Sequence, residues 1–217
     1  MNFYTEWKAR SDLLAAGKMV YDKGNLVAKD GNLSVRLPDG NILITCTGCC
    51  KGDMAMAQIT KIDPEGRVLS GDPPARDYRM HLAVYKERDD ICGIVHTHAP
   101  VTTGFASSSF DVESVLIPEV MLFLGEIAFS GYATPTTEEV PRSVVEAMRR
   151  KPGSSVVVMA LHGALAFDRN VLNAAYKILS LDMALSVTAV ARSLGGLRAL
   201  TDGQMQALQR LLHPNET

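Results

Sequence analysis

Apolar residues recur along the chain with two different periods, which together predict interspersed helices and strands. Between residues 5 and 23, Leu13, Leu14, Met19 and Val20 recur at helical spacing, and Gly24 follows as a C-terminal stop. The same reasoning predicts further helices, which cover residues 77–87, 100–107, 137–150, 171–194 and 202–212.

Strand signals occupy the segments between these helices. Turn residues at positions 38–40 and 64–66 predict hairpins over residues 32–46 and 59–69. Continuous apolar runs predict buried strands over residues 91–95, 120–128 and 155–160. Hairpins mixed with helices indicate an α/β fold with a mainly antiparallel or mixed central sheet and helices packed on it. No repeat or linker divides the chain, so we expect one domain over residues 1–217.

The composition indicates an ordinary soluble globular protein without a nucleic-acid partner. Of the 217 residues, 47% are hydrophobic and 21% charged, and the formal net charge is −2. The compact basic run at residues 149–151 ends a predicted helix, where cations favour the helix dipole. Residues 1–7 lack the features of a signal peptide, and no uninterrupted apolar run has the length of a membrane span. We therefore expect a cytoplasmic protein that does not bind membranes.

Three of the five histidines form a pattern typical of a metal site. His96 and His98 are two residues apart at the end of a predicted buried strand, so both side chains point to one side. His162 follows another buried strand and precedes Gly163, where backbone can approach closely. Three imidazoles with an open coordination position are typical of catalytic zinc. The histidine pair alone could equally be a polar strand end; the third histidine favours the metal.

Asp77 is the candidate acid beside this site. It follows Pro73 and Pro74 at the start of a predicted helix, where an acid also favours the helix dipole, and both roles are compatible. His81 lies on the same helix face; it either orients a ligand or is an ordinary helix histidine, and we favour the latter.

Two glycine-containing loops, residues 31–34 and 45–52, are suited to anion binding because their backbone N–H groups can converge on a phosphate. Cys46 and Cys49 form a C-x-x-C pair, but no second pair completes a zinc site. We interpret the four cysteines as packing or loop residues.

Taken in order, these segments resemble the class II aldolase/adducin family, which includes the fuculose-1-phosphate aldolases. The similarity runs from Gly31 to the helix after His162, nearly the whole chain. The matching segments are Gly31-Asn32-Leu33-Ser34, Thr47-Gly48, Pro74-Ala75-Arg76-Asp77, Val95-His96-Thr97-His98, Tyr132-Ala133-Thr134-Pro135 and His162-Gly163.

The resemblance implies a three-layer α/β/α domain, often a homotetramer, that acts as a metal-dependent carbon–carbon lyase on a small phosphorylated sugar or sugar acid. His96, His98 and His162 would hold the metal, Zn2+ first, with Mn2+ or Co2+ as alternatives. The metal would polarise a ketone and stabilise the enediolate that cleavage leaves. Asp77 would move the proton on carbon, and Asn32, Thr47, Gly48 and Arg76 would contact the phosphate or another substrate anion.

Three departures from the family pattern define the alternatives. Asp77 replaces the usual glutamate, Ala75-Arg76 replaces a serine pair, and Leu122 stands near the position of a catalytic tyrosine. Arg76 favours, as runner-up, a decarboxylase that acts on a 3-oxo sugar-acid phosphate. A 4-epimerase ranks lower, because Met121 occupies the position of its acid. A non-catalytic adducin-like binding domain would have no need of three convergent imidazoles.

Overall fold

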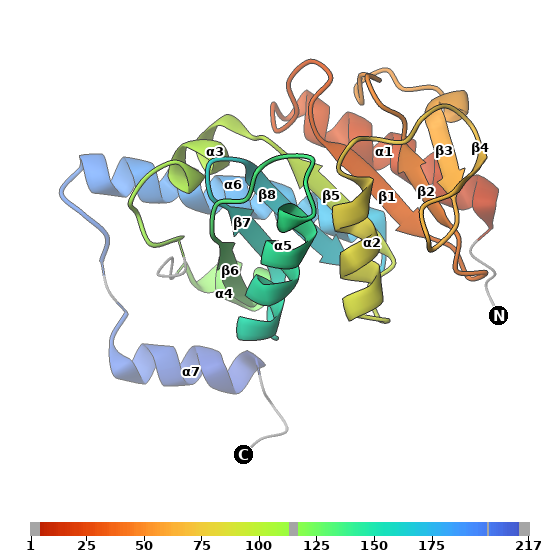
Figure 1. Ribbon diagram of the computed structural model, residues 1–217. Helices are drawn as coiled ribbons and strands as arrows, with labels where there is room; N and C mark the ends of the chain where they lie inside the picture. The colour runs from red at the N-terminus through yellow and green to blue at the C-terminus, as the bar shows by residue number, and fades with distance from the viewer. Residues whose placement is uncertain (1–4, 113–116, 199, 213–217) are drawn as a thin grey trace.

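A computed structural model describes residues 5–112, 117–198 and 200–212. Within these ranges eight strands form one sheet in the order β4-β3-β2-β1-β5-β8-β7-β6 (Figure 1). Only the β6–β7 pair among them is parallel. The strands are β1 (Asn32–Arg36), β2 (Ile42–Thr45), β3 (Ile59–Ile62), β4 (Val68–Ser70), β5 (Gly93–Thr97), β6 (Glu126–Ser130), β7 (Ser154–Met159) and β8 (Gly163–Asp168).

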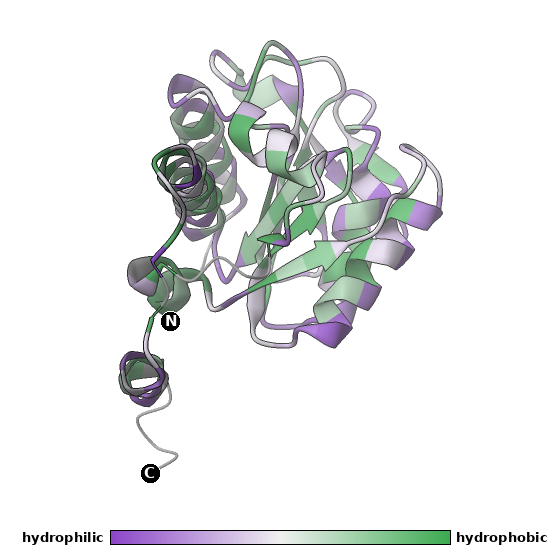
Figure 2. Cartoon of the chain, turned by 90° about the vertical axis from the view of Figure 1, so that its left-hand side faces the viewer, coloured by the Kyte–Doolittle hydropathy of each residue, from purple (hydrophilic) through white to green (hydrophobic). Residues whose placement is uncertain are grey.

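Helices cover both faces of this sheet, which gives the expected three α/β/α layers (Figure 2). One face carries α1 (Glu6–Asp22), α3 (Pro100–Ala106), α4 (Pro118–Leu124) and α6 (Val171–Ser193). The other face carries α2 (Tyr78–Glu87) and α5 (Glu139–Arg150). The short helix η1 (Met56–Gln58) precedes β3, and α7 (Asp202–Leu212) stands away from the layers beside α4 (Figure 1).

Alternation along the strands decides which residues enter which core. On β5, Val95 joins the core beneath α1 and α6, whereas Ile94 joins the core beneath α2 and α5. His96 has the parity of Ile94, so its side chain lies on the sheet face covered by α2 and α5. The strand period therefore directs His96 and His98 to one side of the sheet.

Most of the predicted elements are confirmed, including both hairpins and the first helix. The Thr5 hydroxyl caps that helix by accepting a hydrogen bond from Lys8 N at 3.2 Å. The prediction of a strand over residues 120–128 is wrong in its first half, because residues 118–124 form α4 and the strand begins only at Glu126. Pro118 at the first turn favours a helix, and a short apolar run does not by itself distinguish helix from strand.

Strand β8 was not predicted, although it is central to the sheet. It pairs with β5 on one side and with β7 on the other, both in antiparallel register. Its residues Ala164 to Phe167 are buried, and their alternation of small and large side chains gives a weak local strand signal.

Helix α6 is long and apolar enough to span a membrane by length and composition alone, although no uninterrupted apolar run suggested such a span. One face of the helix packs against β5, β8 and α1. Its buried residues are Val171, Ala174, Ala175, Ile178, Leu181, Ala184, Leu185 and Thr188. Such burial is what the core helix of a layered α/β protein requires.

Candidate functional site

The end of β5 positions two of the three predicted metal-binding histidines. β5 lies between β1 and β8, so that His96 is paired with Asn32 on one side and Leu165 on the other. His98 follows directly after the strand, with its ring centroid 4.7 Å from that of His96. The Nε2 atoms of His96 and His98 are 2.9 Å apart, so both rings point at one position.

His162 reaches the same position from the turn between β7 and β8. Its ring centroid lies 4.9 Å from that of His96 and 5.0 Å from that of His98. The turn requires a left-handed backbone at Leu161, with φ of 58°. The ligand atoms of the three histidines all lie within 4.8 Å of one another, so the structure brings together the three residues that the sequence suggested.

Two glycines allow the neighbouring strands to approach β5 this closely. A Cβ at Gly31, just before β1, would lie 2.5 Å from the carbonyl oxygen of His96. A Cβ at Gly163, at the start of β8, would lie 2.3 Å from the carbonyl oxygen of Thr97 and 3.1 Å from His98 Cδ2. Both glycines also have positive φ, so the backbone around the histidines depends on residues without a side chain.

Burial and hydrogen bonding keep the three imidazoles in the form that binds a metal. His96 is fully buried and its Nδ1–H donates to the carbonyl oxygen of Ala164 at 3.0 Å, which leaves the Nε2 lone pair facing His98. Burial lowers the pKa of His96 well below its usual value, and it also lowers the pKa values of His98 and His162. Metal ions bind neutral imidazole, so these shifts favour a metal site.

A cavity of about 400 Å3 opens over this triad. Asp77 lines it beside His98 and His162, and its charge opposes the burial effect on the pKa of both histidines. Asp77 occupies the N-cap position of α2, but its side chain makes no capping hydrogen bond. The carboxylate is therefore not engaged in capping the start of α2, and it is available to a ligand in the cavity.

The predicted anion-binding residues line the same cavity. Asn32 belongs to β1, Thr47 and Gly48 follow β2, and Arg76 lies in the loop before α2. The structure thus gathers three segments that are far apart in the sequence around one space. His96 is fully buried behind the residues that line the cavity and is not itself part of the cavity surface.

Three residues of this cavity, Lys29, Asp30 and Thr136, were not predicted from the sequence, whereas Lys51 and Pro135 entered the prediction only as members of longer segments. Lys29 and Asp30 directly precede the Gly31–Asn32 segment, which is the only sequence signal they carried. A carboxylate oxygen of Asp30 lies 4.0 Å from Nδ1 of His98, on the side of the ring away from His96. Thr136, with φ of 67°, brings the loop before α5 to the cavity rim.

His81 is fully buried and orients Asn32. Its Nε2–H donates to Oδ1 of Asn32 at 2.5 Å, and its Nδ1 lies 2.7 Å from the hydroxyl of Ser34. Tyr85 OH lies 2.7 Å from the same hydroxyl. Because Oδ1 of Asn32 is engaged, the amide presents its NH2 group as the remaining donor. His81 is thus more than an ordinary helix histidine, although it supports Asn32 rather than a histidine of the triad.

The sequence also singled out the four cysteines and Leu122, and of these only Cys46 lines the cavity. All four cysteines are free thiols, Cys46 and Cys49 are buried, and burial raises the pKa of Cys49 to about 11. They are therefore packing and loop residues. Leu122, near the expected tyrosine position, lies on α4 with 44% of its surface exposed and does not line the cavity.

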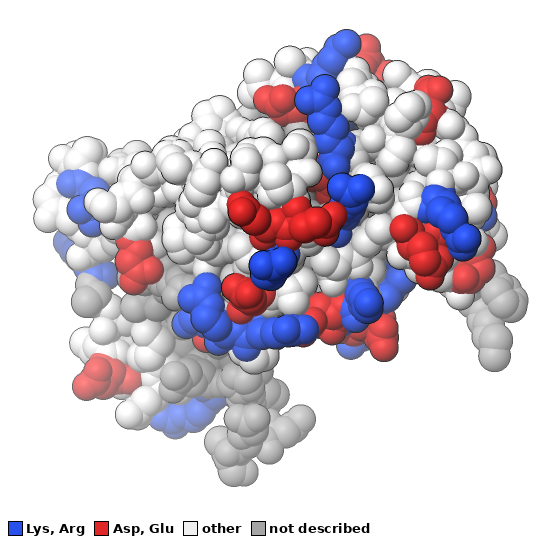
Figure 3. Space-filling view, in the orientation of Figure 1, with Lys and Arg blue, Asp and Glu red and all other residues white. Residues whose placement is uncertain are grey.

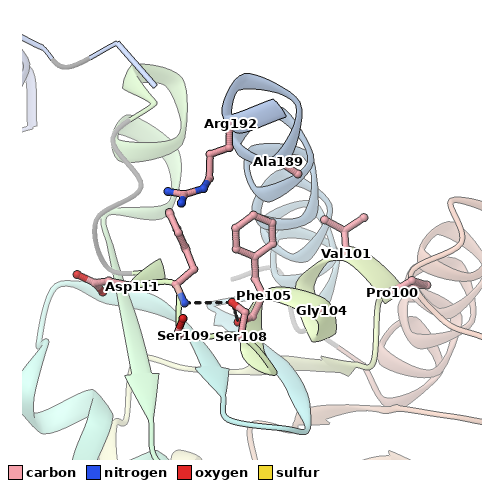
Figure 4. Close-up of a pocket in the computed structure, with 10 residues that line it drawn as sticks. Pro100, Val101, Gly104, Phe105, Ser108, Ser109, Asp111, Ala189 and Arg192 are labelled. Atoms are coloured by element: carbon pink, nitrogen blue, oxygen red, sulfur yellow. Dashed lines mark hydrogen bonds between the residues drawn. The ribbon is translucent and has the colours of Figure 1, made fainter. Parts of the chain in front are cut away.

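A larger hollow, of about 780 Å3, lies between α3 and the end of α6 (Figure 4). The guanidinium of Arg192 stands 5.0 Å from the ring centroid of Phe110 on its wall. Among its lining residues there is no group of histidines or acids that could hold a metal, so its size does not make it the reactive site.

Charged side chains on the face seen in Figure 3 are of both signs and intermixed, without a broad basic area. That distribution is unlike the basic stripe by which proteins bind nucleic acid.

Comparison with known proteins places the chain in a family. Residues 11–189 match the model of the Class II Aldolase and Adducin N-terminal domain. The chain is 28% identical over 175 residues to a 3-oxo-tetronate 4-phosphate decarboxylase of Haemophilus influenzae, covering 79% of this chain and 82% of that protein. It is 34% identical over 169 residues to a 5-methylthioribulose-1-phosphate/5-deoxyribulose-1-phosphate aldolase of Rhodospirillum rubrum, covering 78% and 74%.

The fold agrees with that assignment. An L-fuculose 1-phosphate aldolase structure superposes with a TM-score of 0.86 at 24% identity, covering 98% of each chain. The matched segment includes the three histidines, Asp77 and both anion-binding loops. The chain therefore belongs to the class II aldolase and adducin family.

Proposed function

We propose that this protein is a metal-dependent lyase that cleaves a carbon–carbon bond in a small phosphorylated sugar or sugar acid, with aldol cleavage of a ketose phosphate as the leading reaction. The observation that carries the proposal is the convergence of three imidazoles beneath a cavity that also holds Asp77 and both anion-binding loops. A binding module would not require neutral, converging histidines at the base of a polar cavity.

His96, His98 and His162 would hold the metal. The donor set fits a divalent ion, because the three rings are neutral and the Nε2 atoms of His96 and His98 face each other with no other partner among the described residues. We propose Zn2+, with Mn2+ and Co2+ as alternatives, since imidazole suits all three. When bound, the metal would supply Lewis acidity to the substrate's carbonyl group.

Asp77 would handle the proton. Its carboxylate makes no capping hydrogen bond to α2. It lies beside His98 and His162, where the substrate's reacting carbons would be held. A carboxylate in that place can take a proton from a substrate hydroxyl as the bond breaks and return one to carbon afterwards. Its short side chain also permits contact with the metal, so Asp77 would serve as base, as ligand or as both.

The remaining cavity residues would bind the substrate's anionic group. Asn32 offers its NH2 group because His81 holds its oxygen. Gly48, with φ of 73°, turns the loop after β2 toward the cavity beside Thr47. Arg76 lines the cavity and forms no ion pair with any described residue, so its guanidinium is free to bind phosphate or carboxylate in a bidentate manner.

Decarboxylation of a 3-oxo sugar-acid phosphate is the second candidate. Arg76 favours it, because a guanidinium suits a carboxylate that a ketose phosphate lacks, and the similarity to a 3-oxo-tetronate 4-phosphate decarboxylase points the same way. The 34% identity to an aldolase keeps aldol cleavage first. The two reactions share the metal, the proton transfer and the phosphate contacts, and differ in whether an aldehyde or carbon dioxide leaves.

Epimerisation and a purely binding role rank lower. Met121, which takes the place of the epimerase acid, lies on α4, does not line the cavity and has no ionisable group.

Product analysis of the metal-loaded protein tests the proposal. Aldehyde release from ketose 1-phosphates supports the aldolase, and carbon dioxide release from 3-oxo acid phosphates supports the decarboxylase. His162→Ala should lose metal and turnover together, whereas Trp7→Ala, a change at an exposed residue of α1 outside the cavity, should keep both. Purified protein without bound metal, turnover by the His162→Ala variant, or loss of water as the only reaction would contradict the proposal.

We also propose a cytoplasmic homo-oligomer, with a tetramer as the expected form. Exposed apolar residues recur at helical spacing along α6 and at its C-cap residue, and they are Met183, Val187, Val190 and Leu194. Their exposed fractions run from 47% to 81%, which is unfavourable for a stripe that stays in water. Light scattering on the purified protein gives the mass, and a monomer would contradict this expectation.

A further inference from the structure

Lys51 is a buried lysine that joins the two anion-binding loops. Only 2% of its surface is exposed, yet it lines the cavity above the triad. Its Nζ donates to the carbonyl oxygen of Lys29 at 2.7 Å and to that of Cys49 at 2.9 Å. Lys29 belongs to the loop that leads to Gly31 and Asn32, and Cys49 follows Thr47 and Gly48. The amine therefore lies where the two loops meet.

Within the described residues, this buried cation has no acidic partner. Lys51 forms no ion pair with any residue in the described ranges, and two carbonyl oxygens leave one of its three N–H donors unused. A buried charge is costly unless an opposite charge accompanies it. Burial accordingly lowers the pKa of Lys51, whereas Cys49, Cys46 and Asp30 act on it in the opposite direction. An incoming anion would supply the missing partner.

Lys51 and Gly52 pack closely against α1. A Cβ at Gly17 of α1 would lie 3.1 Å from the carbonyl oxygen of Lys51 and 3.3 Å from its Cβ. A Cβ at Gly52 would lie 2.3 Å from the ring of Tyr21, also on α1. The backbone at Lys51 and Gly52 thus packs closely on α1, and the hydrogen bonds to Lys29 and Cys49 hold the amine between the two loops.

We propose that Lys51 is a specificity-determining residue that receives the phosphate dianion of the substrate. The loops it joins offer amide and hydroxyl donors from Asn32 and Thr47, which orient a phosphate but carry no charge, and the Lys51 ammonium would complete them. That the bound phosphate belongs to a sugar or sugar-acid substrate rests on the proposed function. Phosphate binding itself depends on the loops, on Lys51 and on Arg76 at the same cavity, and not on which reaction follows.

Two variants of Lys51 distinguish the effect of its charge on phosphate binding from its hydrogen bonds to the two loops. Lys51→Met removes the amine with little change in length, and Lys51→Gln keeps N–H donors for the two carbonyl oxygens but no charge. Lys18→Met is the matched control, because Lys18 also belongs to the N-terminal region but is exposed and paired with Asp22 on α1. Titration calorimetry with inorganic phosphate on metal-loaded protein reports affinity, and thermal unfolding without phosphate reports stability.

Both Lys51 variants should bind inorganic phosphate at least about tenfold more weakly than the wild type, the range for one charge-assisted hydrogen bond. Lys18→Met should be unchanged. At least one Lys51 variant should unfold at or above the wild-type temperature, because a buried charge without a partner has been removed. With substrate, KM should rise more than kcat falls.

Phosphate affinity within about twofold of the wild type in a folded Lys51 variant would overturn the proposal, because one charge-assisted hydrogen bond is worth more than that. Loss of stability in both variants with unchanged phosphate affinity would assign Lys51 a structural role instead. If the wild type binds phosphate through Lys51 but releases neither aldehyde nor carbon dioxide from any substrate, the lyase proposal fails and the phosphate site stands.

Discussion

Replacing Gly163 by alanine should weaken metal binding and also lower the free energy of unfolding. The new Cβ would lie 2.3 Å from the carbonyl oxygen of Thr97, and real Cβ contacts are essentially never below 3.0 Å. That oxygen belongs to the backbone of the central strand β5, and the next contact is the ring of His98 at 3.1 Å. Relief therefore has to move β5 and the turn that carries His162 apart.

The cost can be worked out from two contributions. A residue with a side chain at φ of 147° is strained by about 1–3 kcal/mol, and overpacking adds about 1–3 kcal/mol. Metal ligands tolerate displacements of only about 0.2 Å, and loss of supporting contacts weakens metal binding about 10–100-fold. We expect Gly163→Ala to lose about 2–6 kcal/mol of unfolding free energy and at least about tenfold in Zn2+ affinity.

Chelator competition measures the affinity, and urea unfolding of the metal-free protein measures the stability. Gly24→Ala is the control, since Gly24 has φ of 77° but a Cβ added there would meet no atom within 4 Å. It should cost about 1–2 kcal/mol and leave Zn2+ binding unchanged. Wild-type metal affinity in Gly163→Ala would refute the argument that close approach at Gly163 positions His98 and His162.

Three more variants or conditions probe the triad and the buried histidine behind it. His96→Ala should abolish high-affinity Zn2+ binding, which metal analysis after dialysis checks; retained metal would exclude the triad. His81→Leu should cost about 2–4 kcal/mol in urea unfolding, because the oxygen of Asn32 and the hydroxyl of Ser34 each lose a buried partner; a change below about 1 kcal/mol would show that the network rearranges freely. Burial lowers the pKa of His81 to about 3 from 6.5, so between these values only the unfolded chain takes up its proton. Metal-free wild type should therefore lose up to about 1.4 kcal/mol per pH unit more than His81→Gln as the pH falls from about 6.5, and equal slopes in urea unfolding between about pH 5 and 7 would contradict this.

Local patterns along the chain were enough to predict most of the fold. Both hairpins, the first helix and the long helix that ends before Gly195 have strong periodicity and clear stop signals, so the sequence predicts them without knowledge of their neighbours. Residues 118–124 show where local patterns fail to distinguish a helix from a strand. Their apolar run fits a buried strand and a helix equally well, and the presence of Pro118 decides for the helix.

For the candidate site, the sequence by itself determined which residue types are present and which pairs share a face. The strand period places His96 and His98 on one side, and the order of motifs matches the family. The sequence could not show that His81 fixes the amide of Asn32, or that Lys51 joins two loops, because those contacts span 49 and 22 residues. Neither residue carries a local pattern that distinguishes it from an ordinary helix or loop residue.

Only the tertiary structure decided that the three imidazoles meet. That convergence depends on β8, which returns antiparallel beside β5, and on two glycines that let its first residue and the segment before β1 approach the strand that bears the histidines. The sequence determines the chemistry of each side chain, because that is a property of the residue. The distance between side chains depends on packing between segments that are far apart in the chain, and packing is a property of the whole fold.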